Sequence, residues 1–261
     1  AIWHLAALFE VHSIIIEAGA IPDLVQLLKM GSPRAQEMAT AGISDLALGA
    51  VQERLAAGEQ EAKEKLTNTA VMDCELAGIG QLEPDDQEEE TCNDRLTSIA
   101  KAGVVVPLVA LLSSGTAQAR ENTASALWHL ALDGQIRLAI AKCGGISPLV
   151  AILDDGTEQA RAHAANALAR LATANEDNQS QIAKSCVGLL GNKNTGTQRR
   201  AARVISDLAS GNSGSPVLIV NAGAISPLVN LLSGGALDVK EEVARALSTI
   251  ALNSPSTQLA I

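Results

Sequence analysis

Hydrophobic and polar positions recur along the chain with a period of roughly 40 residues. Within each period, apolar residues follow one another at intervals of three and four, which places them on one face of a helix. In residues 158–172, for example, Ala164, Leu168 and Leu171 share such a face. Polar stretches containing Gly, Pro, Ser or Thr separate these segments. The pattern predicts an all-α chain of short amphipathic helices.

The first repeated segment joins one predicted helix to the next. A Gly is followed five residues later by Leu-Val at four places: Gly19, Gly103, Gly144 and Gly223. These glycines lie two, one and two periods apart, and a shortened copy at residues 181–198 accounts for the junction missing from the last interval. Gly just after a helix readily adopts the left-handed conformation, and Pro in the next first turn loses no hydrogen bond. We therefore predict a helix end at Gly144, a helix start near Pro148 and an N-cap at Thr157.

A second repeated segment ends the longest helix of each unit. It has Leu or Ile, then Leu or Ile three positions later, then Ala, at residues 1–8, 42–49, 126–133, 167–174, 204–211 and 246–253. A fainter copy occupies residues 77–83. Each unit thus contains three helices and cannot bury its apolar face alone, so the units are predicted to stack as a solenoid.

These segments resemble the armadillo repeats of beta-catenin, importin-alpha and plant or protist armadillo proteins. The phrases "IEAGAIPDLVQLL" (16–28) and "NAGAISPLVNLL" (221–232) carry the resemblance, which covers nearly the whole chain. It implies a right-handed superhelix of about six repeats, forming one solenoid over residues 1–261. Both ends are expected to fall within repeats, as in a piece of a longer array. HEAT repeats, the main alternative, lack the third helix and the Gly-to-Pro junction.

Residues 50–97 depart from the pattern and are predicted to form a divergent repeat with an acidic loop at 83–94. The first part is helical in composition and highly charged, and has no Gly-to-Pro junction. The loop holds seven acidic residues between Glu83 and Asp94, which account for most of the net charge of −10. It is either a solvated loop or an insert that binds a partner or masks the protein's own groove.

In armadillo proteins the third helices line a concave groove for extended peptides, and an Asn in the second repeated segment clamps the peptide backbone. The corresponding slots here hold His4, Asp45, Gln81, His129, Arg170, Asp207 and Thr249. None is Asn, and the Trp ladder of importin-alpha is also absent. The resemblance therefore does not extend to recognition of nuclear import signals. We expect Trp128, beside one slot, to be half-buried between neighbouring helices.

Residues one and two turns before each slot lie on the same helix face. They extend the slots into strips that add Asn122, Ser125, His163, Asn166, Arg200, Arg203, Glu242 and Arg245. Because the strips hold more Arg than acidic residues, we predict that the groove binds an extended acidic or polar segment of a protein. The alternative is that these are simply solvated side chains.

Other chemistry is not indicated by the sequence. Equivalent residues on stacked helices lie roughly 8 to 10 Å apart, too far for a nucleophile and its base, and no catalytic motif occurs, so no enzyme activity is expected. The four His and four Cys are scattered, which argues against a metal site or cofactor. A pI of about 4.9 argues against nucleic-acid binding, and no apolar run is long enough for membrane insertion. We expect a cytoplasmic or other reducing intracellular location, with further chain preceding residue 1.

Three functional interpretations follow. The leading one is a non-catalytic scaffold that binds a partner segment along the groove. The second is a structural subunit of a large cytoskeletal, axonemal or membrane-attached assembly, with contacts through edges and loops. The third is the substrate-binding region of a larger enzyme such as a U-box ubiquitin ligase.

Overall fold

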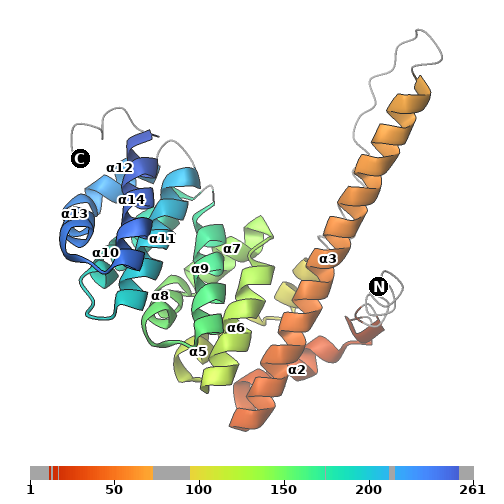
Figure 1. The fold of residues 1–261 in the computed structure, drawn as a ribbon. Coiled ribbons are helices and arrows are strands. Elements are labelled where there is room, and N and C mark those ends of the chain that lie inside the picture. The colour runs from red at the N-terminus through yellow and green to blue at the C-terminus, as the bar shows by residue number, and fades with distance from the viewer. Residues whose placement is uncertain are drawn as a thin grey trace.

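The structure is a computed structural model that describes residues 12, 14–16, 18–72, 95–173, 175–211 and 215–252. Throughout these residues the regular elements are helices, and no strand occurs among them. The helices stack side by side in an open arc, with α2 and α3 at one end and α13 and α14 at the other (Figure 1). The predicted all-α solenoid is confirmed.

The helices fall into a ladder and a second set that packs behind it. The ladder contains the longest helix of each unit, and neighbouring members contact one another in chain order: α3 (Pro33–Met72), α6 (Ala117–Leu130), α9 (Glu158–Ala172), α11 (Thr195–Gly211) and α14 (Leu237–Leu252). The second set comprises α2 (Ala20–Met30), α5 (Val105–Ser114), α7 (Gly134–Lys142), α8 (Ile146–Asp155), α10 (Glu176–Leu190), α12 (Ser215–Asn221) and α13 (Ile225–Gly234).

The junctions between helices have the predicted geometry. Gly144 has φ 77°, and the other three glycines of the repeated segment are likewise left-handed. The amide of Gly144 donates to the carbonyl of Ala141 at 2.9 Å, which completes the end of α7. The hydroxyl of Thr157 accepts a hydrogen bond from the amide of Ala160 at 3.1 Å, so it caps α9 as expected. Local sequence therefore determines where these helices begin and end.

The core runs continuously through the stack and is built from aliphatic side chains. Leu127, Leu130, Ile152 and Leu168 are fully buried, and small residues such as Ala164 lie between the helices. Alanine at these positions lets neighbouring helices approach closely. Each unit thus buries its apolar face against the next one.

The shortened unit replaces two helices by one. Where the preceding unit has α7 and α8, the chain here forms the single 15-residue helix α10. Two buried side chains attach α10 to the end of α9: the Asn178 amide donates to the Leu171 carbonyl at 2.8 Å, and the Gln179 amide donates to the Ala172 carbonyl at 2.7 Å. The shortening inferred from residues 181–198 is therefore confirmed.

Residues 50–72 differ from the expected divergent repeat. The helix α3 does not end near Gly49 but continues as one 40-residue helix, whose C-terminal half extends away from the stack (Figure 1). Residues 51–72 contain no proline and are rich in Ala, Glu, Lys and Gln, which favour continued helix. No stop signal therefore interrupts the helix.

The helix α3 packs directly against α6. The Asn122 amide on α6 donates to the Glu37 carbonyl on α3 at 3.2 Å, and the Ser44 hydroxyl donates to the Ser125 hydroxyl at 2.9 Å. The helices α3 and α6 are therefore direct neighbours on the ladder. The divergent repeat predicted over residues 50–97 stays a prediction, because its expected third-helix segment at residues 77–83 lies outside the described residues. Gln81, its predicted slot, and the acidic segment 83–94 lie outside the described residues.

Candidate functional site

The ladder brings the predicted groove residues of successive repeats onto neighbouring helices. Those within the described residues are Asp45 on α3; Asn122, Ser125 and His129 on α6; His163, Asn166 and Arg170 on α9; Arg203 and Asp207 on α11; and Arg245 and Thr249 on α14. His4 lies outside the described residues, as Gln81 does. The structure shows that these side chains differ in whether they face solvent or one another.

The strip residues on α6 are occupied by contacts between helices. Asn122 binds the backbone of α3 through its amide and accepts a hydrogen bond from Gln118 at 3.0 Å. Ser125 accepts from Ser44. On α3 itself, Asp45 is exposed and borders a shallow, mostly apolar hollow with Leu24 and Leu46. The α3–α6 part of the ladder therefore offers few unpaired polar groups.

Trp128, His129, His163 and Arg170 form a cluster between α6 and α9, which we call the central cluster. The Trp128 ring stacks on His163 with ring centroids 5.7 Å apart and lies 4.7 Å from the His129 ring. The Arg170 guanidinium lies over the Trp128 ring, 5.2 Å from its centroid, and donates to the Trp128 carbonyl at 2.8 Å. The prediction that Trp128 is half-buried between helices is confirmed.

The histidines of the central cluster are held in their neutral form. Burial, together with the charge of Arg170 and the neighbouring His163, lowers the pKa of His129 to about 4. Burial also lowers the pKa of His163, although Glu121 opposes this shift. His129 is only 5% exposed, so the structure places this slot residue in the core rather than on the open face. Arg170 is similarly committed to Trp128.

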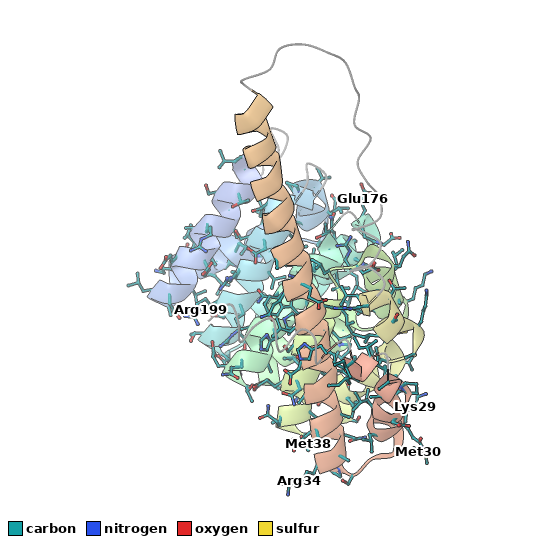
Figure 2. All side chains as sticks on the ribbon, turned by 90° about the vertical axis from the view of Figure 1, so that its right-hand side faces the viewer. Lys29, Met30, Arg34, Met38, Glu176 and Arg199 are labelled. Atoms are coloured by element: carbon teal, nitrogen blue, oxygen red, sulfur yellow. The ribbon has the colours of Figure 1, made fainter. Side chains whose placement is uncertain are left out.

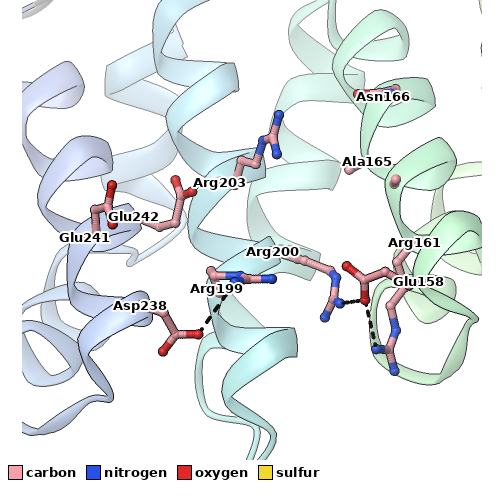
Figure 3. A pocket seen from close by; sticks show the side chains of 11 residues that line it. Glu158, Arg161, Ala165, Asn166, Arg199, Arg200, Arg203, Asp238, Glu241 and Glu242 are labelled. Carbon is pink, nitrogen blue, oxygen red and sulfur yellow. Dashed lines mark hydrogen bonds and ion pairs between the residues drawn. The ribbon is translucent and has the colours of Figure 1, made fainter.

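A hollow of about 400 Å³ opens where α9, α11 and α14 lie side by side (Figure 3). We call it the C-terminal hollow. Its lining combines predicted strip residues with charged residues near the N-terminal ends of the three helices: Glu158, Arg161, Ala162, Ala165 and Asn166 from α9; Arg199, Arg200 and Arg203 from α11; and Asp238, Glu241 and Glu242 from α14.

Most charged groups of the C-terminal hollow are paired. Arg200 forms an ion pair with Glu158, and Arg161 lies 3.9 Å from the same carboxylate. Arg199 reaches Asp238 across the gap between α11 and α14, at 3.7 Å (Figure 3). Because four arginines face four carboxylates, the hollow as a whole has no positive excess. The positive excess predicted from the sequence was counted on the strip residues alone. That count left out the carboxylates of Glu158, Asp238 and Glu241, which precede the strips or lie beside them.

Pairing extends to the far edge of the hollow on α14. Arg245 lies 3.8 Å from Glu241 and 3.3 Å from Glu242, each in the same helix. Partial burial raises the pKa of Asp207 on α11, although Arg203 opposes that shift. The hydroxyls of Ser206 and Thr249 lie 3.5 Å apart, which connects the last two ladder helices.

Two side chains of the C-terminal hollow stand apart from these pairs. Arg203 is exposed and Asn166 is half-buried, and neither makes a side-chain hydrogen bond or ion pair within the described part of the chain. Figure 3 shows Arg203 extending from α11 toward α9, the helix that carries Asn166. A guanidinium and an amide at this position can bind a carboxylate and a peptide backbone, respectively.

Across residues 12–252, as far as they are described, no three His, Cys, Asp or Glu side chains are grouped as metal ligands would be. None of the described helices alone has the length and apolar character of a membrane span. Two pairs of consecutive helices, each bent at a short break, meet both criteria only when the two helices are taken together. These pairs are Arg95–Lys101 with Val105–Ser114, and Gly134–Lys142 with Ile146–Asp155.

Comparison with known proteins agrees with the fold and the repeats. Residues 96–132 and 212–252 match the family model of the armadillo/beta-catenin-like repeat. No curated protein matches the chain significantly.

Solved structures match over nearly the full length. A designed armadillo repeat protein in complex with the peptide (KR)4 has a TM-score of 0.61 and 22% identity, covering 95% of this chain and 90% of that one. Computationally designed armadillo repeat proteins for modular peptide recognition give a TM-score of 0.59 and 23% identity, with 94% and 91% covered. The predicted fold class is therefore confirmed.

Proposed function

We propose that this chain, which matches the armadillo repeat model at residues 96–132 and 212–252 and has the fold of designed armadillo repeat proteins, is a non-catalytic scaffold whose third-helix ladder binds an extended segment of a protein partner. The observation that carries this proposal is the pair of unengaged side chains, Asn166 and Arg203, at the C-terminal hollow. Polar side chains elsewhere on the ladder are largely used by the protein itself. The segment is therefore expected to bind mainly over α9, α11 and α14.

The chemistry of these two side chains matches an extended segment. An extended chain presents a backbone donor and acceptor at every residue, and the Asn166 amide supplies both complementary groups. The five donors of Arg203 form a planar fork that fits a carboxylate. We therefore propose that an acidic side chain of the partner binds at Arg203 while Asn166 holds the neighbouring backbone.

The similar designed protein solved with a (KR)4 peptide provides a useful contrast. The ligand of that protein is uniformly basic, whereas the side chain left unpaired in the present hollow is itself basic. We expect a uniformly basic peptide to be repelled by Arg203. Of the three interpretations from the sequence, the scaffold and the substrate-binding region of a larger enzyme both use this groove, whereas the assembly subunit makes its contacts through edges and loops.

The proposal also includes a reducing location such as the cytoplasm. Both described cysteines are free thiols. Cys186 is fully buried, and burial raises its pKa to about 12, so it is unreactive. Cys143 is exposed and has no described cysteine partner.

Fluorescence anisotropy with three labelled octapeptides tests the proposed function. (Glu-Ser)4 is expected to bind more tightly than (Gly-Ser)4, and (Lys-Arg)4 more weakly than both. Arg203→Glu should weaken binding of (Glu-Ser)4 by about tenfold, because it replaces an attraction by a repulsion. Asn166→Ala should weaken all peptides that bind, since it removes a backbone contact.

The matched control is Arg34→Glu. Arg34 is exposed in the first turn of α3, distant from Arg199 at the hollow (Figure 2). This variant makes the same change of net charge, so it should leave the affinities unaltered at moderate ionic strength. Failure of all three peptides to bind, or equal losses in Arg203→Glu and Arg34→Glu, would contradict the proposed function.

A further inference from the structure

We infer that the C-terminal hollow selects a segment of mixed charge, in which an acidic and a basic side chain lie two residues apart. The acidic side chain binds at Arg203, and the basic one binds at Glu241 and Glu242. The inference rests on the proposed function and specifies the partner segment for the same site. It is based on an uneven distribution of charge. One side of the hollow has a positive excess and the other a negative excess, although the lining as a whole has equal numbers of arginines and carboxylates.

The side of the hollow formed by α9 and α11 has a positive excess. Arg161 and Arg200 share the single carboxylate of Glu158, so one guanidinium charge is not neutralised. Arg203 adds a further charge, which interacts with the Asp207 carboxylate one turn later on α11 but forms no ion pair with the lining residues of the hollow. An acidic side chain entering between α9 and α11 therefore meets a net positive charge, from Arg161, Arg200 and Arg203 against Glu158 and Asp207.

The side formed by α14 has the opposite excess. Glu241 and Glu242 share the single guanidinium of Arg245, at 3.8 and 3.3 Å. The Glu242 side chain is only 16% exposed, and its Oε2 atom is buried without a hydrogen bond. Burial raises the pKa of Asp207 on α11, Arg203 lowers it, and Glu242 and Arg245 act on it with opposite signs, so this carboxylate lies between the two sides. A buried carboxylate that lacks hydrogen bonds is costly, and a Lys or Arg side chain would supply donors to it.

The pair formed by Arg199 and Asp238 lies between the two sides and compensates itself, at 3.7 Å. Figure 3 shows Arg200 and Arg203 on the α9 and α11 side of the hollow and Glu241 and Glu242 on the α14 side. A segment with two acidic side chains would satisfy Arg203 but place its second carboxylate against Glu241 and Glu242. A segment with two basic side chains would satisfy Glu241 and Glu242 but place its second positive charge against Arg203. Only a mixed pair is attracted at both sides.

The spacing of the pair follows from ordinary geometry. Packed helices lie roughly 8 to 10 Å apart, and side chains at i and i+2 of an extended chain point the same way, about 7 Å apart. Flexible Glu and Lys side chains cover the small difference. An acidic and a basic residue at i and i+2 can therefore bind α11 and α14 simultaneously, whereas adjacent residues point to opposite faces.

The test uses three labelled peptides that differ only at two positions: Ser-Gly-Glu-Gly-Lys-Gly-Ser, the same sequence with two Glu, and the same sequence with two Lys. Binding to the full chain is measured by fluorescence anisotropy. The mixed peptide is expected to bind about fivefold more tightly than either uniform peptide. Glu242→Gln should remove its advantage over the two-Glu peptide, and Arg203→Gln its advantage over the two-Lys peptide.

The control is Glu176→Gln, which removes the same charge from an exposed position on α10, distant from Arg199 (Figure 2). Tighter binding of the two-Glu peptide, lost in Arg203→Gln, would overturn the inference while leaving the proposed function intact. Tighter binding of the two-Lys peptide, or equal effects of Glu242→Gln and Glu176→Gln on the mixed peptide, would also overturn the inference. Absence of binding by all three peptides, together with (Glu-Ser)4, would overturn both.

Discussion

The central cluster and the C-terminal hollow occupy equivalent positions on the ladder, yet they use their polar side chains in opposite ways. In the central cluster, Trp128 and Arg170 contact each other and the two histidines are neutral. In the C-terminal hollow, small side chains such as Ala165 leave space, and Arg203 remains unpaired. Position within a repeat therefore determines which face a residue lies on. Whether it is available to a partner depends on the residues one repeat away.

The largest expected effect comes from removing the ring at the centre of the central cluster. Trp128→Ala should lower the free energy of unfolding by about 3 kcal/mol, because it removes a large half-buried side chain and the surface on which Arg170 and His163 pack. Chemical denaturation measures the change. Val106→Ala, at a side chain 63% exposed on α5, is the control and should change the value by less than about 0.5 kcal/mol. Comparable losses in the two variants would contradict the assigned role of Trp128.

Protonation of His129 provides the next largest effect. The pKa of this histidine is about 4 in the folded chain, against an ordinary value of 6.5. Between these values the unfolded chain binds more protons, so the free energy of unfolding should fall as pH falls from 6.5 to 4, by about 2 kcal/mol. Above pH 6.5 both states are neutral at this residue, and it contributes no pH dependence. His129→Gln should flatten the dependence in this window, and an unchanged slope would show that His129 is not buried in its neutral form.

Smaller changes in stability and binding should distinguish Arg170 from Arg203, which the sequence predicts as equivalent groove residues. Arg170→Gln should lower the free energy of unfolding by about 1 kcal/mol, since it removes a contact with an aromatic ring and a hydrogen bond to a carbonyl. Arg203→Gln should change it little but weaken binding of (Glu-Ser)4. Chemical denaturation gives the free energy of unfolding of each variant, and fluorescence anisotropy gives its affinity for (Glu-Ser)4. A reversed pattern, with Arg203 important for stability and Arg170 for binding, would refute the comparison between the two regions.

The elements set by local sequence were predictable. The left-handed glycines, the Pro in the following first turn and the Thr157 cap depend on residues within a few positions, and the structure confirms them. The continuation of α3 was not predicted, because it depends on the absence of a stop signal after Gly49 rather than on a positive signal. Its direct packing on α6 involves residues far apart in sequence, which a search for a regular period does not reveal.

The candidate site was predictable only in outline. Helical periodicity correctly placed Asn166, Arg170 and Arg203 on the ladder. It could not show that Arg170 binds the Trp128 carbonyl, a contact between residues one repeat apart. Nor could it show that Arg200 is neutralised by Glu158, again from the neighbouring repeat. Counting charges on the strips therefore overestimated the positive excess, because it omitted the carboxylates that lie beside them.

The central claim is that a partner segment binds on the ladder at the C-terminal hollow. Photo-crosslinking from a single position tests this claim most directly. A benzophenone side chain is placed either at Ala162, an exposed residue that lines the hollow, or at Val106, an exposed residue on α5 outside the ladder. The account predicts that Ser-Gly-Glu-Gly-Lys-Gly-Ser is captured at position 162 and not at position 106, and that Arg203→Glu lowers the capture yield about tenfold at peptide concentrations below the dissociation constant. Equal capture at the two positions, or an unchanged yield at position 162 in Arg203→Glu, would contradict it.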